Sequence, residues 1–313
     1  MIPVFRVPGT LDRTSEDCNT VVSAEYCKDC GKVEARFYHC NNWDCPTCYF
    51  WTASRAAHRA EDRLLGTQKA YADVGKHPGR ILHVMFSVPE SEYDNFDYKQ
   101  QRKKCYGYAE MIGMLGGAVA FHPYRVKKEY HKPLYDYLKN AGLPGGHWRA
   151  IHDNPLNLSS WRDYVYFAPH FHILGFYPKI VMKSNEFFEL TGWTYKTIGV
   201  AQDRNVFRTL RYLCTHLAVP EGHDQAITYF GLASYNKTSV EAVKTSSFKA
   251  CPACGSENYY LIACGEYMFS RYLEGLKPSE DSLLLHVRVV KTIKRFTVRV
   301  HQSTIPEVSA IAC

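Results

Sequence analysis

Twelve cysteines, distributed very unevenly, constrain this 313-residue chain more than any other feature of its sequence. Six of them lie between Cys18 and Cys48, and three lie between Cys251 and Cys264. The N-terminus lacks the charged and apolar segments of a secretion signal, so we expect a cytoplasmic protein whose thiols stay reduced. Clustered, reduced cysteines are typical of metal ligands. The sequence therefore predicts a zinc-binding region towards each end of the chain.

The first cluster contains two Cys-x2-Cys pairs that are separated by 14 residues. This spacing is close to that of a structural zinc site with four thiolate ligands. The four expected ligands are Cys27, Cys30, Cys45 and Cys48. Cys40 and Cys18 lie close enough in the sequence to replace members of this set. Such a site would hold together a small lobe that has little core of its own.

The second cluster resembles half of a zinc ribbon with one additional thiol. It contains Cys251 and Cys254 in a Cys-x2-Cys-Gly segment, followed by Cys264. No fourth ligand is evident, because Tyr267 occupies the place that a second pair would use. Either a distant histidine or cysteine completes a second zinc site, or these cysteines are ordinary buried residues.

The charge balance favours an anionic partner. Lysine and arginine exceed aspartate and glutamate by 38 to 31, which gives a net charge of +7. The Ala- and Leu-rich segment from Phe50 to Asp73 predicts a helix, and Arg55, Arg59 and Arg63 recur on it every four residues. This arginine stripe is either a DNA-phosphate contact or a solvated face.

No segment is typical of a membrane span. The longest uncharged stretch, around residues 111–121, is interrupted by glycine and falls far short of the roughly 20 residues that a span requires. We therefore expect no membrane partner.

The cysteine-poor middle of the chain alternates between strand-like and helix-like patterns. We expect a buried strand over residues 80–88, two helical pieces over 91–141, and two β-rich pieces around Pro169 within 163–176. A helix is predicted over 205–219, and a half-buried strand over 286–302. The expected regions are a zinc lobe with its basic helix (1–75), a central domain (76–235) and a zinc-ribbon-like β region (236–313).

The strongest chemical signal is the segment Pro-His-Phe-His-Ile-Leu-Gly at residues 169–175. On a strand, side chains two residues apart point to the same face, so His170 and His172 present adjacent imidazoles while Phe171 packs on the other face. Two neutral imidazoles and a third ligand make a divalent-metal site that leaves positions open for substrate. Two unrelated strand histidines are the simpler interpretation of this segment alone.

Downstream, Tyr212 and His216 lie four residues apart within the predicted helix. This spacing places both side chains on one helical face, one turn apart. A phenol in that position can attack phosphorus while a metal polarises the phosphoryl oxygens. Taken alone, Tyr212 is one of 23 tyrosines, and most tyrosines are structural.

A strand, a hydrophobic His-x-His segment and a helix with a tyrosine follow one another in this order, after a CNNWDCPTCYFW segment. In this respect the chain resembles the HUH endonuclease superfamily, and especially the rolling-circle replication initiator (Rep) proteins of small plasmids or viruses, archaeal ones above all. The resemblance covers residues 27–219. It implies an α+β fold with a five-stranded antiparallel sheet and flanking helices. It also implies nicking and joining of one DNA strand through a 5′-phosphotyrosine.

The resemblance assigns roles to individual residues. His170 and His172 become ligands of a catalytic Mg²⁺ or Mn²⁺, and Tyr212 becomes the nucleophile. The third metal ligand is either His216, which is coupled to Tyr212 by the helix, or Asp163, upstream of the histidines. Relatives with two tyrosines space them by four residues, whereas here Arg208 and His216 occupy those positions. Another group must therefore complete the cycle.

The expected partners are single-stranded or hairpin origin DNA and the host's helicase and polymerase, because the chain has no Walker motif. Two other functions are compatible with the same residues. A rolling-circle-type transposase would use the same catalytic motifs on element ends. A non-catalytic, zinc-containing DNA-binding protein would use the histidines and Tyr212 only as core residues.

Overall fold

The computed structural model describes residues 5–10, 17–143, 146–179, 181–200, 205–218, 225–248, 250–257, 259–263, 287–288 and 290–300. They form two compact units. The sheet unit consists of the described parts of 1–12, 42–241 and 298–313, and the cysteine unit of those of 13–41 and 242–297. The three expected regions of the chain stay a prediction.

A five-stranded antiparallel sheet forms the centre of the sheet unit, in the order β6-β3-β5-β4-β7. β5 is therefore the middle strand, with β3 and β4 on either side. The strands are β3 (Arg80–Ser87), β4 (Gly116–Val126), β5 (Val165–Tyr177), β6 (Thr194–Val200) and β7 (Ile227–Gly231). The prediction of an α+β fold with a five-stranded antiparallel sheet is thus confirmed.

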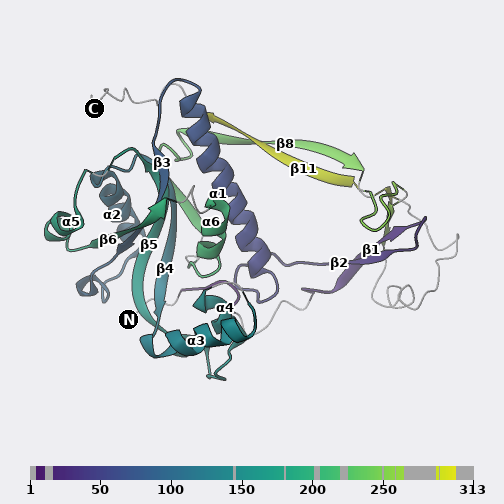
Figure 1. Cartoon of the computed structure of the whole chain (residues 1–313), viewed down its shortest axis with the longest axis horizontal. Coiled ribbons are helices and arrows are strands. Elements are labelled where there is room, and N and C mark those ends of the chain that lie inside the picture. Colours follow the sequence, from purple (N-terminus) through teal and green to yellow (C-terminus); the bar gives the residue numbers. More distant parts are fainter. Residues whose placement is uncertain are drawn as a thin grey trace. The chain divides into compact units, whose positions relative to one another are not determined.

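Six α-helices within the described ranges surround this sheet. Figure 1 shows α1 and α6 on one side of it and α2 and α5 on the other, with α3 and α4 at one end. The helices are α1 (Tyr49–Ala72), α2 (Tyr98–Met111), α3 (Lys128–Asn140), α4 (His147–Asp153), α5 (Ser184–Thr191) and α6 (Val206–Cys214). Short 3₁₀ helices cover Glu90–Glu92 and Trp161–Tyr164. None of the helices described here has both the length and the apolar character that crossing a bilayer requires.

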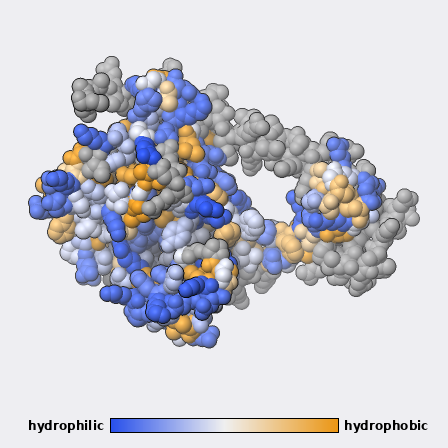
Figure 2. All heavy atoms as spheres, in the orientation of Figure 1, coloured by the Kyte–Doolittle hydropathy of each residue, from blue (hydrophilic) through white to orange (hydrophobic). Residues whose placement is uncertain are grey.

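The alternation of side chains on β5 divides the core into two layers. Phe171 and Ile173 pack with apolar residues of α2 and α5, whereas Leu174 and Phe176 pack with those of α1 and α6. A third apolar cluster joins α3 and α4. His170 and His172 share the face of Leu174 and Phe176, so they lie on the α1 and α6 side of the sheet. On the side drawn in Figure 2, the surface of this unit is mostly hydrophilic with small hydrophobic patches.

The structure differs from the predicted pattern at β4 and β5. β4 lies where helical pieces were expected, because Val119 and Phe121 face one core layer while Ala118 and Ala120 face the other. β5 runs without interruption through Pro169. The β4 register shifts between His122 and Tyr124, opposite this proline, so no ladder hydrogen bond from Pro169 is needed there.

The cysteine unit contains a small antiparallel sheet in the order β10-β9-β1-β2. Its strands are β1 (Val21–Cys27), β2 (Val33–Phe37), β9 (Tyr259–Ala263) and β10 (Val287–Arg288). The longer strands β8 (Thr238–Phe248) and β11 (Val290–Val300) form a separate two-stranded sheet.

Candidate active site

Three imidazoles converge on the α6 side of the central sheet. One nitrogen from each of His122, His170 and His172 lies within 4.8 Å of the other two. The strand register explains the convergence, since His122 on β4 is directly opposite His170 on β5, and His172 lies two residues further on the same face. His122 and His170 are buried, with 0% and 6% exposure. Three imidazoles on adjacent strands could hold a divalent metal ion.

Hydrogen bonds fix the ring orientation of two of these histidines. Nδ1 of His170 donates to the carbonyl of Ala168 at 2.8 Å, which leaves Nε2 with its lone pair. Nδ1 of His172 lies 2.8 Å from Nε2 of His83, a neighbouring side chain on β3. If Nδ1 of His172 donates to His83, its Nε2 also keeps a lone pair. Histidine ligands commonly donate their second nitrogen to a partner in this way.

His122 provides the test of whether a metal fits. Its side chain is fully buried, and neither ring nitrogen makes a hydrogen bond of good geometry within the described part of the chain. Leaving a buried polar group without a partner costs about 1–3 kcal/mol. A metal ion bound between the three rings would satisfy one of these nitrogens, so the residues present suit such a ligand.

The electrostatic environment keeps all three rings neutral. Burial, together with the nearby Arg125 guanidinium, lowers the pKa of His170 to about 3. Burial and the neighbouring histidines hold the pKa values of His122 and His172 well below the usual value. Because a metal binds the unprotonated imidazole, these three side chains are ready to act as ligands at neutral pH.

The two residues expected as the third ligand occupy different places. The ring centroid of His216 lies 4.2 Å from that of His122, so His216 is next to the group without being one of its three members. Asp163 is part of a capping box, in which its carboxylate accepts a hydrogen bond from the Ser160 amide. No acidic side chain joins the three histidines among the residues that the structure describes.

Tyr212 lies in the last turn of α6, beside the histidines. Its ring centroid is 4.8 Å from that of His216, and 45% of the residue is exposed. Burial of the remaining surface raises the pKa of the phenol. A Cβ atom at Gly146 would come within 2.7 Å of the Tyr212 hydroxyl oxygen, so a glycine there makes room for the ring. The helix ends at Cys214, and His216 follows in the turn after it.

A pocket of about 240 Å³ opens beside Tyr212. Arg149 of α4 and Arg208 and Arg211 of α6 line it, and none of the three forms an ion pair within the described ranges. The remaining lining residues are aromatic or small, and include Tyr49, Phe50, Trp148, His152 and Thr215. Three guanidinium groups in one pocket favour an anion such as phosphate.

The predicted arginine stripe of α1 is not continuous on the surface. Arg55 and Arg59 are exposed, but Arg63 is buried and donates hydrogen bonds to the carbonyls of Ala233 and Thr238, each at 2.8 Å. Its guanidinium also lies over the rings of Tyr229 and Tyr235. Arg63 therefore connects α1 to the segment after β7 and is not available to DNA.

The thiols of the cysteine unit form a group of four. The sulfurs of Cys27 and Cys254 are 3.6 Å apart, and those of Cys30 and Cys251 are 3.7 Å apart. These distances are too long for a disulfide, and they approach the separation of about 3.8 Å that a tetrahedron with 2.3 Å zinc–sulfur bonds requires. Burial opposes ionisation of Cys251, but the backbone amides of Ala253 and Cys254 lower its pKa to about 7. This group could hold zinc.

The ligand sets thus differ from those expected. Cys27 and Cys30 lie with the pair from the second cluster and not with Cys45 and Cys48, so the half ribbon obtains its missing ligands from the start of the chain. Of the other thiols in the first cluster, Cys18 and Cys40 belong to the cysteine unit, and Cys45 and Cys48 belong to the sheet unit. Cys264 lies outside the described residues.

Sequence reasoning missed two residues of the site, His122 and His83. A signal for His122 exists in the segment Gly-Gly-Ala-Val-Ala-Phe-His at residues 116–122, because alternate residues there would share one face of a strand. His83 lies within the strand that was expected over residues 80–88. It is two residues after Ile81, so both side chains point to the same face of that strand.

The chain matches no protein-family model, no curated protein and no solved structure.

Proposed function

We propose that this chain is a metal-dependent DNA endonuclease and strand transferase with an HUH fold, and that it initiates rolling-circle replication of a plasmid or virus in the cytoplasm. Its substrate is single-stranded or hairpin origin DNA. The fold supports this proposal, because the antiparallel sheet carries His170 and His172 on its middle strand, as the family resemblance implies.

One observation carries the proposal: an exposed tyrosine stands beside a buried group of neutral histidines. Tyr212 contacts His216, which contacts His122, a member of the three-histidine group. Tyr212 and the histidines come from segments far apart in the sequence, so their meeting results from the fold. A tyrosine that served only to fill the core would be buried, whereas 45% of Tyr212 is exposed.

The reaction follows from the chemistry of these groups. The Tyr212 oxygen attacks a DNA phosphorus atom and loses its proton, and the bond from phosphorus to the 3′ oxygen breaks. The phosphate remains esterified to Tyr212 at the 5′ end of one fragment, and the other fragment leaves with a 3′-hydroxyl, which takes up a proton. Attack by a 3′-hydroxyl on the phosphotyrosine reverses these changes and rejoins a strand.

The surrounding side chains prepare this step. A tyrosine phenol is protonated at neutral pH, and burial raises the pKa of Tyr212 further, so its proton must be accepted when it attacks. The imidazole of His216 contacts the Tyr212 ring, and burial lowers its pKa to about 3, so it is neutral at pH 7; it can orient the phenol but is a weak proton acceptor. Arg149, Arg208 and Arg211 are positioned to bind phosphate oxygens beside Tyr212.

His122, His170 and His172 would hold the divalent metal, Mg²⁺ or Mn²⁺ in use. When bound, such an ion supplies positive charge that polarises phosphoryl oxygens. The cysteine group would hold structural Zn²⁺, and the host would provide the helicase and polymerase.

The test uses overlapping single-stranded oligonucleotides, labelled at the 3′ end, that cover the DNA on either side of the gene. Each is incubated with Mn²⁺ and the full chain, and the products are separated by denaturing electrophoresis. We expect a labelled protein band with the native chain and with Tyr135→Phe, an exposed tyrosine of α3 that serves as a matched control. Tyr212→Phe should give no band.

An equal band in Tyr212→Phe would contradict the nucleophile assignment. DNA binding without any covalent band would instead indicate the non-catalytic zinc protein. Cleavage confined to the ends of a mobile element, and absent at an origin, would identify the transposase alternative.

A further inference from the structure

A second and larger pocket, of about 440 Å³, lies away from the histidine group. Four segments form it: the end of α1 with the turn after it, the end of α2, the start of β4, and the turn after β7. Leu115 precedes the first residue of β4, whereas His122 lies seven residues after Leu115, about 23 Å further along the strand at 3.3 Å per residue. The pocket is therefore outside the proposed nicking site.

Backbone hydrogen bonds hold the turns around this pocket in place without a bound ligand. The Leu232 amide donates to the Leu115 carbonyl at 2.9 Å, and the Lys76 amide donates to the Tyr71 carbonyl at 2.9 Å. A Cβ atom at Gly231, whose φ is +53°, would lie 2.2 Å from the Leu115 carbonyl oxygen, so only glycine allows this approach of the two turns. A ligand could enter without a rearrangement of these turns.

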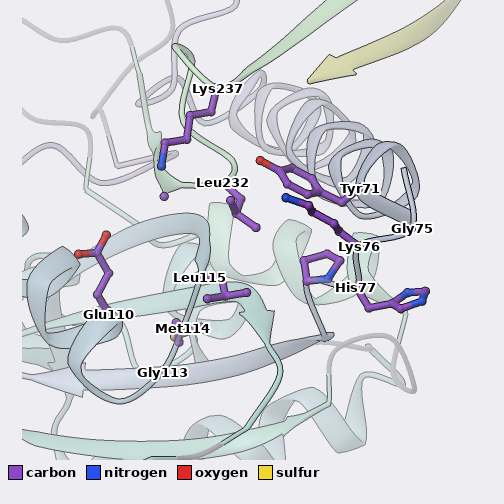
Figure 3. Close-up of a pocket in the computed structure, with 12 residues that line it drawn as sticks. Tyr71, Gly75, Lys76, His77, Glu110, Gly113, Met114, Leu115, Leu232 and Lys237 are labelled. Carbon is purple, nitrogen blue, oxygen red and sulfur yellow. The ribbon is translucent and has the colours of Figure 1, made fainter. Parts of the chain in front are cut away.

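The Tyr71 hydroxyl is the unexplained group of this pocket. Tyr71 is only 2% exposed, and its hydroxyl has no hydrogen-bond partner in the part of the chain that the structure describes. Figure 3 shows the side chain extending from α1 toward Leu232 and Lys237. A buried hydroxyl without a partner destabilises the free protein, so its presence at a pocket points to a ligand that accepts its hydrogen bond.

The charged groups around the pocket define the chemistry of that ligand. Lys76 extends into the pocket beside Tyr71, and Lys237 lies on the opposite side (Figure 3). Lys237 forms no ion pair among the described residues. Glu110 lines the pocket below Lys237 and can accept a hydrogen bond from a donor on the ligand. Two lysines favour a phosphate group, which carries up to two negative charges.

Apolar side chains occupy the space between these charges. Met114 and Leu232 are almost completely buried, with 1% and 5% exposure, and Leu115 lies between them in Figure 3. A bare phosphate ion would leave this apolar surface uncovered. A pocket of this volume, with an apolar floor and a few polar groups, is typical of a site for a small organic molecule.

We propose that this pocket binds a nucleoside monophosphate or a phosphate ester of similar size. Its phosphate contacts Lys76 and Lys237, its ring covers Met114, Leu115 and Leu232, a donor on the ring faces Glu110, and an acceptor receives the Tyr71 hydrogen bond. The site does not depend on the proposed nicking reaction, since it shares no residue with the histidine group or with the pocket beside Tyr212.

The test uses the full chain, with its methionine and leucine methyl groups labelled for NMR, and no DNA. AMP, adenosine and inorganic phosphate are titrated separately to 5 mM. We expect AMP to shift the methyl signals of Met114, Leu115 and Leu232 and to leave that of the remote Leu134 unchanged. Adenosine lacks the phosphate and inorganic phosphate lacks the ring, so each should bind at least about tenfold more weakly than AMP.

Two variants connect the binding to the named groups. Tyr71→Phe should weaken AMP binding by about tenfold, the effect of one lost hydrogen bond, while raising the Tm of the free protein. Lys237→Ala should weaken AMP but not adenosine. Lys69→Ala removes an exposed lysine of α1 that pairs with Asp73, and it should leave AMP binding unchanged.

Three results would overturn the proposal. One is the absence of pocket shifts with AMP at 5 mM, and another is equal binding of AMP and adenosine. The third is a Tyr71→Phe variant that binds AMP as tightly as the native chain. None of these measurements involves nicking, so they succeed or fail independently of the proposed endonuclease.

Discussion

The histidine group and the cysteine group of Cys27, Cys30, Cys251 and Cys254 are both suited to a metal, but they are supported in opposite ways. The histidines stand on a sheet with an apolar core layer on each face, and strand register alone brings them together. In the cysteine unit, the buried apolar residues among the side chains that the structure describes are only Cys18, Ala24, Cys27 and Cys251.

This difference separates two uses of a metal. Where an apolar core already fixes the ligands, the metal is not needed for folding, and its role can be catalytic. Where the ligands themselves make up most of the buried surface, metal binding supplies the folding free energy. We therefore expect loss of metal to unfold the cysteine unit and to leave the sheet unit intact.

The largest effect is expected in the cysteine unit. Cys27→Ser, or removal of zinc with a chelator, should abolish the protection of β1 and β2 from hydrogen exchange, because structural zinc contributes about 10 kcal/mol or more. Peptides from β3 and β5 should exchange as in the native chain. Unchanged protection of β1 in the zinc-free protein would contradict the expectation that only the cysteine unit depends on metal for its folding.

The next largest effect concerns His122. His122→Phe should weaken Mn²⁺ binding more than 100-fold by calorimetry, while the Tm of the metal-free protein stays the same or rises, since two buried nitrogens without a hydrogen bond of good geometry are removed. Asp163→Asn is the matched control and should bind Mn²⁺ normally. The reverse pattern would make Asp163 the third ligand and His122 a core residue.

A smaller effect is expected at His83, which contacts His172 without belonging to the group of three. His83→Phe should weaken Mn²⁺ binding by about 10- to 100-fold, the usual effect of losing a hydrogen-bond partner of a ligand. An affinity equal to that of the native chain would show that the His83 contact does not orient His172.

The smallest effects are expected in the pocket beside Tyr212. Arg149→Ala, Arg208→Ala and Arg211→Ala should each weaken single-stranded DNA binding several-fold and reduce the salt dependence of log K by about 0.7 per lost phosphate contact. The Tyr212→Phe background prevents cleavage during the titration. Lys103→Ala removes an exposed charge from α2, on the other side of the sheet. It should change the DNA affinity and the salt dependence of log K less than the three arginine variants do.

Local periodicity was sufficient to predict part of the site. His170 and His172 alternate with Phe171 along a strand, and Tyr212 follows the helical pattern of α6, so each lies on the element that the sequence predicted. These elements are defined by side chains a few residues apart, and the sequence shows such spacings directly.

Long-range pairing could not be predicted in the same way. His122 alternates with apolar residues over 116–122, but it joins the site through the register of β4 with β5, which no local pattern specifies. Cys27 meets Cys254 across 227 residues, although Cys45 and Cys48 offered a nearer pair with a familiar spacing. Arg63 follows the spacing of Arg55 and Arg59, yet the turn after β7 covers it. In each case a distant segment determined the outcome.

Identifying the residue that carries the DNA tests the role of Tyr212 most directly. The native chain is allowed to react with a cleaved oligonucleotide and Mn²⁺, the product is digested with protease and nuclease, and the modified peptide is sequenced by mass spectrometry. We expect a nucleotide phosphate on Tyr212. A phosphate on another tyrosine, such as Tyr49 in the same pocket, would contradict the central claim that Tyr212 beside the histidine group is the nucleophile.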